Sequence, residues 1–275
     1  MSRPRRTGGL WTAVRIIVLL VAVAVVVLPI AWITLASFKT SAQINQPFLF
    51  WFEPTTKNWE QVLDGGIFGA VWRSLVVAVA TVLVSITVGS MAAYTIARYR
   101  TGGSATRFGM LAAQVLPPAV LVFPLLAVSY SLHLSGTLVP LVFAHLSFVL
   151  PFVTWFLIGF FEAVPRSLEE QARVDGLKRF AAFRKVMLPQ VLPGLGAAAI
   201  FGFTLSWNDM FYGLILAPNN NQLLPVAISS FNTFRGVDLG TMSAAIVISV
   251  LPVVIAAFFV QRRLIQGMGG GAVKF

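Results

Sequence analysis

The chain of 275 residues is 57% hydrophobic and only 11% charged, whereas a soluble domain carries about 25% charged residues. A water-soluble fold of this size cannot hide so much apolar surface, so lipid is expected to replace water around much of the protein. The net charge of +11 comes from short basic clusters between apolar runs, which does not indicate nucleic-acid binding. Cysteine is absent and His133 and His145 lack zinc-ligand spacing, so we expect no metal site and interpret both histidines as helix-end or packing residues.

Six stretches of the chain are long and apolar enough to cross a membrane, which takes about 20 mainly apolar residues. They cover approximately residues 14–38, 71–97, 108–132, 138–161, 191–217 and 242–259. Several contain prolines, which are tolerated where neighbouring helices satisfy the freed carbonyl groups. The sequence therefore predicts an all-α, polytopic membrane protein with six transmembrane helices, forming a single domain over residues 1–275.

The distribution of Lys and Arg predicts the orientation of these spans. If the N-terminus is cytoplasmic, sixteen of the 20 basic residues lie inside, and only Lys39, Lys57, Arg73 and Arg235 lie outside. We therefore expect residues 1–13 and 262–275 to be cytoplasmic ends. The first apolar run is too long for a signal peptide and has no cleavage site, so it is interpreted as an uncleaved first span.

The predicted cytoplasmic loop over residues 162–190 is charged and patterned, unlike the other loops. Pro165 suits the first position of a helix, and Gly176 suits the residue just past its end. Glu169 and Glu170 lie early in that helix, where its dipole favours negative charge. A second helix follows, with Phe180, Phe183 and Met187 in one apolar row. The pattern predicts two short helices that meet at Gly176.

Two interpretations of this loop are available. It could rest on lipid headgroups as an amphipathic helix. Anionic headgroups would, however, repel Glu169, Glu170 and Asp175. A protein partner with a groove accounts for both the apolar row and the acidic residues, because docking of a helix in a groove uses apolar contact together with charge complementarity.

The loop resembles the EAA loop of ABC importer permeases. The matching residues are Glu170, Ala172, Asp175, Gly176, Val186, Leu188 and Pro189. Two positions depart from the pattern, since Gln171 replaces its first Ala and Leu177 follows the glycine where Ala is usual. Residues 91–98, 206–209, 261–263 and 270–274 further resemble the carbohydrate-uptake subgroup, which includes the smaller permease of maltose-type systems.

This resemblance implies the permease subunit of an ATP-driven, binding-protein-dependent sugar importer in the bacterial inner membrane. It implies three kinds of protein partner: a second, related permease, two ATPase subunits and an extracytoplasmic solute-binding protein. The chain has no phosphate-binding loop, so it is expected not to be an enzyme and to hold no cofactor, with ATP and Mg²⁺ bound by the partner ATPase.

The resemblance also implies which residues couple the ATPase to the spans. They are Glu169, Glu170, Ala172, Asp175, Gly176, Phe180, Phe183, Leu188 and Pro189. Glu170 is expected to make an ionic contact with the ATPase, Gly176 to form the turn, and Phe180 and Phe183 to fill the ATPase cleft. The tail over residues 267–275 is either a frayed terminus or a segment that reaches the nucleotide-binding interface.

Trp207, Asn208 and Asp209 form a polar group inside the fifth predicted span. An ionisable side chain at that depth is costly and usually faces a cavity or a partner. An aromatic face with amide and carboxylate groups suits a sugar, so these three residues are candidates for the substrate pathway. Hydrogen bonding between helices is the alternative role.

Two other functions remain open at this point. The same coupling loop would serve an ABC permease for glycerol phosphate, an amino sugar or a peptide. An ion-coupled secondary transporter is a third possibility, but it would leave the docking loop unexplained.

Overall fold

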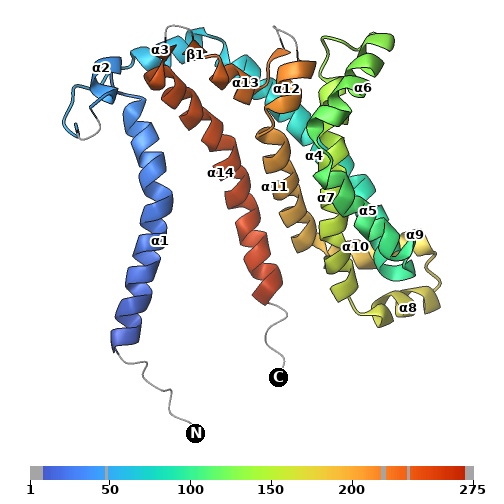
Figure 1. The fold of residues 1–275 in the computed structure, drawn as a ribbon. Coiled ribbons are helices and arrows are strands. Elements are labelled where there is room, and N and C mark those ends of the chain that lie inside the picture. The colour runs from blue at the N-terminus through green and yellow to red at the C-terminus, as the bar shows by residue number, and fades with distance from the viewer. Residues whose placement is uncertain (1–8, 47–48, 218–220, 234–235, 270–275) are drawn as a thin grey trace. The chain divides into compact units, whose positions relative to one another are not determined.

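The computed structural model describes residues 9–46, 49–217, 221–233 and 236–269. Within these ranges the chain is helical apart from one antiparallel pair of two-residue strands, which confirms the all-α fold class (Figure 1). The chain divides into two compact units, Met1–Gly65 with Ser230–Val250 and Gly66–Ser229 with Leu251–Phe275. Of the two expected cytoplasmic ends, residues 1–8 and 270–275 lie outside the described residues.

Four helices are long and apolar enough to cross a membrane. They cover Trp11–Ala36, Ile67–Tyr99, Val139–Ala163 and Leu239–Phe258. Two further spans are available if each of two bent helix pairs counts as one, so length and composition allow four to six spans. The chain is thus a helical, multi-pass membrane protein, and four of the six expected spans correspond to α1, α4, α7 and α14.

The expected third span, residues 108–132, is wrong as a continuous helix. It consists of α5 (Gly103–Val115) and α6 (Pro118–Ser131), which are bent by 86°. The break has a local cause in Pro117 and Pro118: a proline disfavours the helical conformation of the residue before it. Leu116 and Pro117 accordingly have ψ values of 125° and 131°, in the extended region.

The expected fifth span, residues 191–217, is also interrupted. Helix α11 (Leu192–Trp207) ends before residues 208–210, and the short helix α12 (Phe211–Leu216) follows. At its start, α11 is bent by 78° from the preceding segment Arg179–Gln190. Both interruptions expose backbone groups that side chains must satisfy, so they mark positions where polar residues are needed.

The first unit joins the end of α1 to the loops that follow it. Its elements are α1 (Gly9–Ala36), α2 (Ser41–Ile44), α3 (Lys57–Asp64), β1 (Asn232–Thr233), β2 (Gly236–Val237) and the start of α14 (Leu239–Gly269). The buried side chain of Asn58 donates from Nδ2 to the carbonyls of Ser37 and Lys39, at 2.9 and 2.8 Å. Asn58 therefore satisfies carbonyl groups just past the end of α1.

The second unit is built on three packed helices, α4 (Ile67–Tyr99), α7 (Val139–Ala163) and α11 (Figure 1). Small residues let them approach closely, as is usual in membrane bundles. A Cβ added at Gly202 of α11 would lie 3.1 Å from Val149 and 3.4 Å from Val153 of α7, and 3.5 Å from Val82 of α4. Gly202 is therefore a point where the three helices meet.

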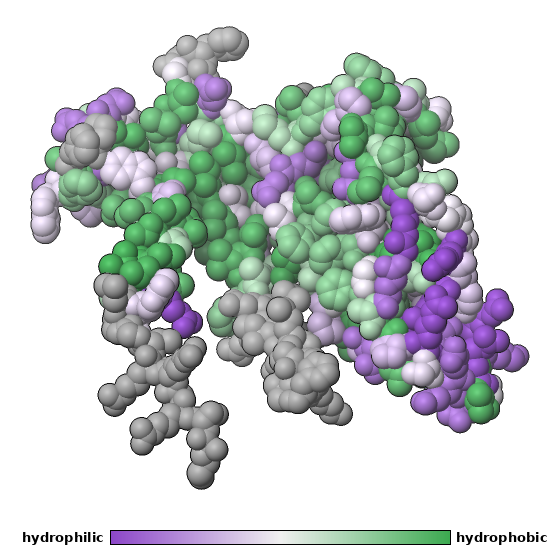
Figure 2. All heavy atoms as spheres, turned by 60° about the horizontal axis from the view of Figure 1, so that its bottom comes forward, coloured by the Kyte–Doolittle hydropathy of each residue, from purple (hydrophilic) through white to green (hydrophobic). Residues whose placement is uncertain are grey.

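Besides α5 and α6, the second unit contains one long loop and one short segment that carry helices. The loop holds α8 (Arg166–Val174), α9 (Arg179–Ala182), the π-helix η1 (Phe183–Met187) and α10 (Leu188–Gln190); the segment holds α12 and α13 (Leu224–Ser229). Figure 2 shows hydrophilic side chains gathered at the end of the unit that carries α8 and α9, with a mainly apolar surface along the helices above.

We predict that Gly202→Leu destabilises the protein by about 1–3 kcal/mol, because the added side chain overpacks the contact of three helices. Gly159→Leu on α7 is the matched control, since a Cβ there meets no atom within 4 Å. Thermal unfolding of the protein in mild detergent measures the difference. Equal midpoints for the two variants would contradict the assigned packing.

Candidate functional site

The turn expected between the two loop helices is present at Gly176. Its φ is +85°, in the left-handed region that glycine adopts without strain. The N–H of Gly176 donates to the carbonyl of Arg173 at 3.1 Å, and the N–H of Leu177 donates to that of Ala172 at 3.0 Å. This pair of bonds is the Schellman motif, which ends α8 sharply and turns the chain into α9. Pro165 is the N-cap of α8, one position earlier than expected.

Helix α8 has an inner and an outer face. Glu169 and Ala172 are buried, as the spacing of three residues on a helix allows. Glu170 and Arg173 are exposed, and the side chain of Val174 is 87% exposed. Asp175 is exposed at the C-cap. The outer face therefore combines acidic, basic and apolar side chains, which is the mixture expected of a docking helix.

The two aromatic residues after the turn lie side by side, with ring centroids 6.2 Å apart, but they differ in exposure. Phe180 is 62% exposed, but Phe183 is only 5% exposed. The ring of Phe183 lies 5.0 Å from that of Tyr94 and 6.2 Å from that of Phe161, measured between centroids. Phe183 therefore packs in the core of its own chain and not, as expected, in a cleft of the ATPase.

The physical reason is the packing of η1 against α4 and α7, which supply Tyr94 and Phe161. Phe183 begins η1, and Met187 at its end is also buried. Leu188 packs against the same core, whereas Pro189 is exposed at the start of α10. The loop is thereby fastened to the helices by its apolar residues.

Glu169, one of the residues expected to couple the ATPase to the spans, is buried against α4. The hydroxyl of Tyr94 donates to Oε1 of Glu169 at 2.6 Å, and that of Tyr99 donates to the same oxygen at 3.2 Å. Nε of Arg98 lies 3.2 Å from Oε2, without the alignment of a hydrogen bond. The acidic residues of α8 and its C-cap that remain exposed are Glu170 and Asp175.

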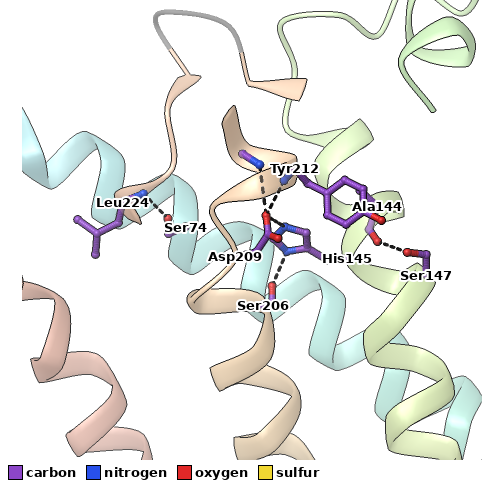
Figure 3. Close-up of polar contacts among 9 residues, drawn as sticks. Ser74, Ala144, His145, Ser147, Ser206, Asp209, Tyr212 and Leu224 are labelled. Carbon is purple, nitrogen blue, oxygen red and sulfur yellow. Dashed lines mark hydrogen bonds and ion pairs between the residues drawn. The ribbon is translucent and has the colours of Figure 1, made fainter. Parts of the chain in front are cut away.

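A second polar cluster lies at the interruption between α11 and α12. Oδ2 of Asp209 accepts the backbone N–H groups of Tyr212 and Gly213 at 3.1 and 3.2 Å, which caps the first turn of α12 (Figure 3). Nε2 of His145 lies 3.3 Å from the same oxygen. The Oδ2 atom acts as an acceptor in these contacts, so Nε2 carries the proton that it donates.

His145 connects α7 to this interruption. The ring is fully buried, and Nδ1 lies 2.6 Å from Oγ of Ser206. With the proton on Nε2, Nδ1 of a neutral ring accepts from the Ser206 hydroxyl. His145 is thus a buried packing residue, as expected, and its ring nitrogens also connect α7 to Ser206 and Asp209. His133, with φ +54° after α6, is a helix-end residue as expected.

A cavity of about 350 Å³ adjoins this cluster. It is lined by Ala113, Gln114, Leu116, Pro118, Leu121, Ser147, Phe148, Thr204, Leu205, Asn208, Asp209 and Tyr212. The rings of Phe148 and Tyr212 are stacked, 6.0 Å apart with an interplanar angle of 5°. Asn208 and Asp209 thus face a cavity, whereas Trp207 is 2% exposed and stacks on Phe203 at 5.4 Å. Trp207 is therefore not among the residues that line it.

Only Asn208 and Asp209 of this site were candidates from the sequence. Other polar lining residues are Gln114 of α5, Ser147 of α7 and Thr204 of α11, and these three helices are separate segments of the sequence. No group of three or more His, Cys, Asp or Glu residues suited to a metal occurs in the described part of the chain.

We predict that His145→Leu lowers the free energy of unfolding by about 1–3 kcal/mol, because it removes the buried ring that bonds Ser206 and one of the partners of Asp209. His133→Asn is the control, since His133 is exposed and Asn tolerates a left-handed backbone. Unfolding of both variants in mild detergent provides the measurement. A His145→Leu variant as stable as the control would show that the cluster carries no energy.

Comparison with known proteins places the chain in a family. Residues 85–270 match the family described as "Binding-protein-dependent transport system inner membrane component". The diacetylchitobiose uptake system permease DasC of Streptomyces coelicolor is 33% identical over 97% of this chain and 98% of its own length. The trehalose transport system permease SugB of Mycobacterium tuberculosis is 31% identical over 90% of this chain and 92% of its own length.

A solved structure shares the fold. A chain from the crystal structure of a bacterial ABC transporter involved in import of the polysaccharide alginate matches with a TM-score of 0.74. The match covers 95% of this chain and 99% of that chain, at 20% identity. The matched residues 85–270 include the loop and every residue that lines the polar cavity. The chain therefore belongs to the family of inner-membrane components of binding-protein-dependent transport systems.

Proposed function

We propose that this chain forms half of the translocation pathway of an ATP-driven carbohydrate importer and couples ATPase closure to alternating access. The observation that carries the proposal is the elbow of α8 and α9 at Gly176, which presents a charged and apolar outer face at one end of the spans. Relatives named for uptake of diacetylchitobiose and trehalose support a saccharide as the solute.

The outer face of the elbow suits a protein groove better than lipid. Val174 and Phe180 offer apolar contact, while Glu170 and Arg173 offer charges of both signs. Anionic headgroups would repel Glu170, whereas a protein can pair it with a basic residue. The partner is an ATPase subunit, so α8 and both chain ends face the cytoplasm in this proposal.

The complete importer contains further subunits in this proposal. A second, related permease supplies the other half of the pathway, and an extracytoplasmic binding protein delivers the solute. Two ATPase subunits bind ATP and Mg²⁺, since this chain has no phosphate-binding loop and no cofactor role of its own. Membrane lipid surrounds the exposed apolar side chains of the spans.

The polar cavity is the proposed solute pathway of this subunit. Its volume of about 350 Å³ lies within the usual range of about 300–1,000 Å³ for small-molecule sites. Asn208, Gln114 and Ser147 supply donors and acceptors for hydroxyl groups, and Tyr212 and Phe148 supply apolar ring surface. None of the described residues that line it is Lys or Arg, which favours a neutral solute over a phosphorylated one.

The function is tested by assembling the chain with its partner subunits. We expect Glu170→Lys to reduce the amount of ATPase that copurifies by at least about tenfold, because disrupting a charged interfacial contact costs about 2–5 kcal/mol. Glu53→Lys, an exposed acidic residue of the first unit, is the control and should retain the ATPase. The proposal would be overturned if the Glu170→Lys variant copurified with wild-type amounts of ATPase, or if an ion gradient drove uptake without ATP.

The solute pathway has its own test. We expect Asn208→Ala to raise the KM for uptake of a labelled neutral disaccharide several-fold, because about 1–3 kcal/mol is lost when a polar partner is removed. ATPase association should not change, since Asn208 lies outside α8 and α9. The control is Thr87→Ala, an exposed α4 position away from the cavity. An unchanged KM for Asn208→Ala would remove this cavity from the pathway.

A further inference from the structure

The C-terminal end of α4 contacts three parts of the chain, which are the end of α7, helix α8 and η1. The side chain of Arg98 is 5% exposed. Its Nη2 donates to the carbonyl of Val164 at 2.8 Å and lies 3.7 Å from Sδ of Met187. Its Nε lies 3.2 Å from the carboxylate of Glu169. One α4 residue thus contacts the end of α7, α8 and η1.

Glu169 receives all its described polar partners from that same end of α4. They are Tyr94, Arg98 and Tyr99, and together with Glu169 we call them the α4–α8 latch. The spacing of four residues from Tyr94 to Arg98 puts both on one face of α4. The latch is therefore a contact between one helix face and one buried carboxylate.

Breaking the latch is energetically different from breaking a surface ion pair. The side chain of Glu169 is 10% exposed, so moving α8 away from α4 would leave a charge without partners in a poorly solvated place. The ion pair of Arg107 and Glu162 offers the contrast, with side chains 42% and 43% exposed. Water replaces the partner there at little cost.

The other end of α4 holds the segment that follows α12. The hydroxyl oxygen of Ser74 accepts the N–H of Leu224 at 2.8 Å (Figure 3). Nε of Arg73 donates to the carbonyl of Gln222 at 3.0 Å. Leu223, between them, packs in one buried cluster with Tyr212 and with Val77 of α4. Tyr212 also lines the polar cavity.

We propose that α4 is a rigid lever between the coupling loop and the solute cavity, and that Arg98 and Glu169 are the positioning residues that fix α8 to it. The proposal rests on the importer function proposed above. Helix α4 has 33 residues and is therefore about 50 Å long, without an internal break. Movement of α8 is transmitted along α4 towards α12, because the latch holds one end of α4 and Ser74 holds the segment after α12 at the other.

The first test measures coupling in the assembled importer in proteoliposomes. We expect Glu169→Gln to raise the number of ATP molecules hydrolysed per solute imported by at least about fivefold. A fivefold effect corresponds to the lower end of typical coupling free energies. The ATPase subunits should stay bound, because the outer face of α8 is unchanged. Glu162→Gln is the matched control, with its carboxylate in an exposed ion pair, and should keep the wild-type ratio.

A second measurement separates a lever from a merely stabilising contact. The chain has no cysteine, so Thr95→Cys on α4 and Gln171→Cys on α8 provide two specific sites for spin labels. In complexes whose other subunits carry no reactive cysteine, the distance between the labels should be the same without nucleotide and with trapped ATP. Adding Glu169→Gln should make that distance differ between the two states.

Each outcome has one meaning. A wild-type complex that imports solute but changes the distance between the labels would overturn the lever, as would a wild-type coupling ratio for Glu169→Gln. Loss of ATPase binding by Glu169→Gln with intact spans would show that Glu169 faces the ATPase, which also overturns it. If the wild-type chain shows no ATP-dependent uptake, the importer function fails instead. Those two failures are therefore distinguishable.

Discussion

A carboxylate held away from water must be surrounded by partners, and this constraint organises both functional regions of the chain. Glu169 takes its partners from α4, and Asp209 takes its partners from α7 and from the backbone of α12. Each carboxylate therefore joins elements that are distant in sequence. One junction fixes the coupling loop, and the other fixes the interruption beside the cavity.

Helix α4 is common to both regions. Its face at Gly89 approaches α7 closely, with an added Cβ only 3.0 Å from Oγ1 of Thr154, so the two helices have little room to slide apart. Its two ends hold α8 and the segment after α12. Close packing makes such a bundle respond to a displacement in discrete steps rather than by gradual deformation. In the proposed importer, a movement at the loop would be transmitted along α4 towards the cavity.

Local features of the fold were predictable from the sequence, and features that depend on distant contacts were not. The turn at Gly176 follows from a glycine after a capped helix, and the membrane class follows from composition. The two adjacent prolines at Pro117 indicated a break, but prolines were expected to be tolerated within a continuous span. The hydrogen bonds of His145 could not be predicted, because Ser206 lies 61 residues away. The burial of Phe183 depends on Tyr94 and Phe161, which are likewise distant in sequence.

The neighbouring residues Glu169 and Glu170 show how one short helix serves two partners. Successive residues on a helix point about 100° apart, so two adjacent acids cannot face the same surface. The sequence pattern alone could not decide which of them turns inward; the tyrosines and Arg98 of α4 decide it, because they supply donors on one side only. The inward acid ties α8 to the spans, and the outward acid is exposed, where the proposed contact with the ATPase would form. In that proposal, a force on the outer face acts on α4 through the same turn of helix.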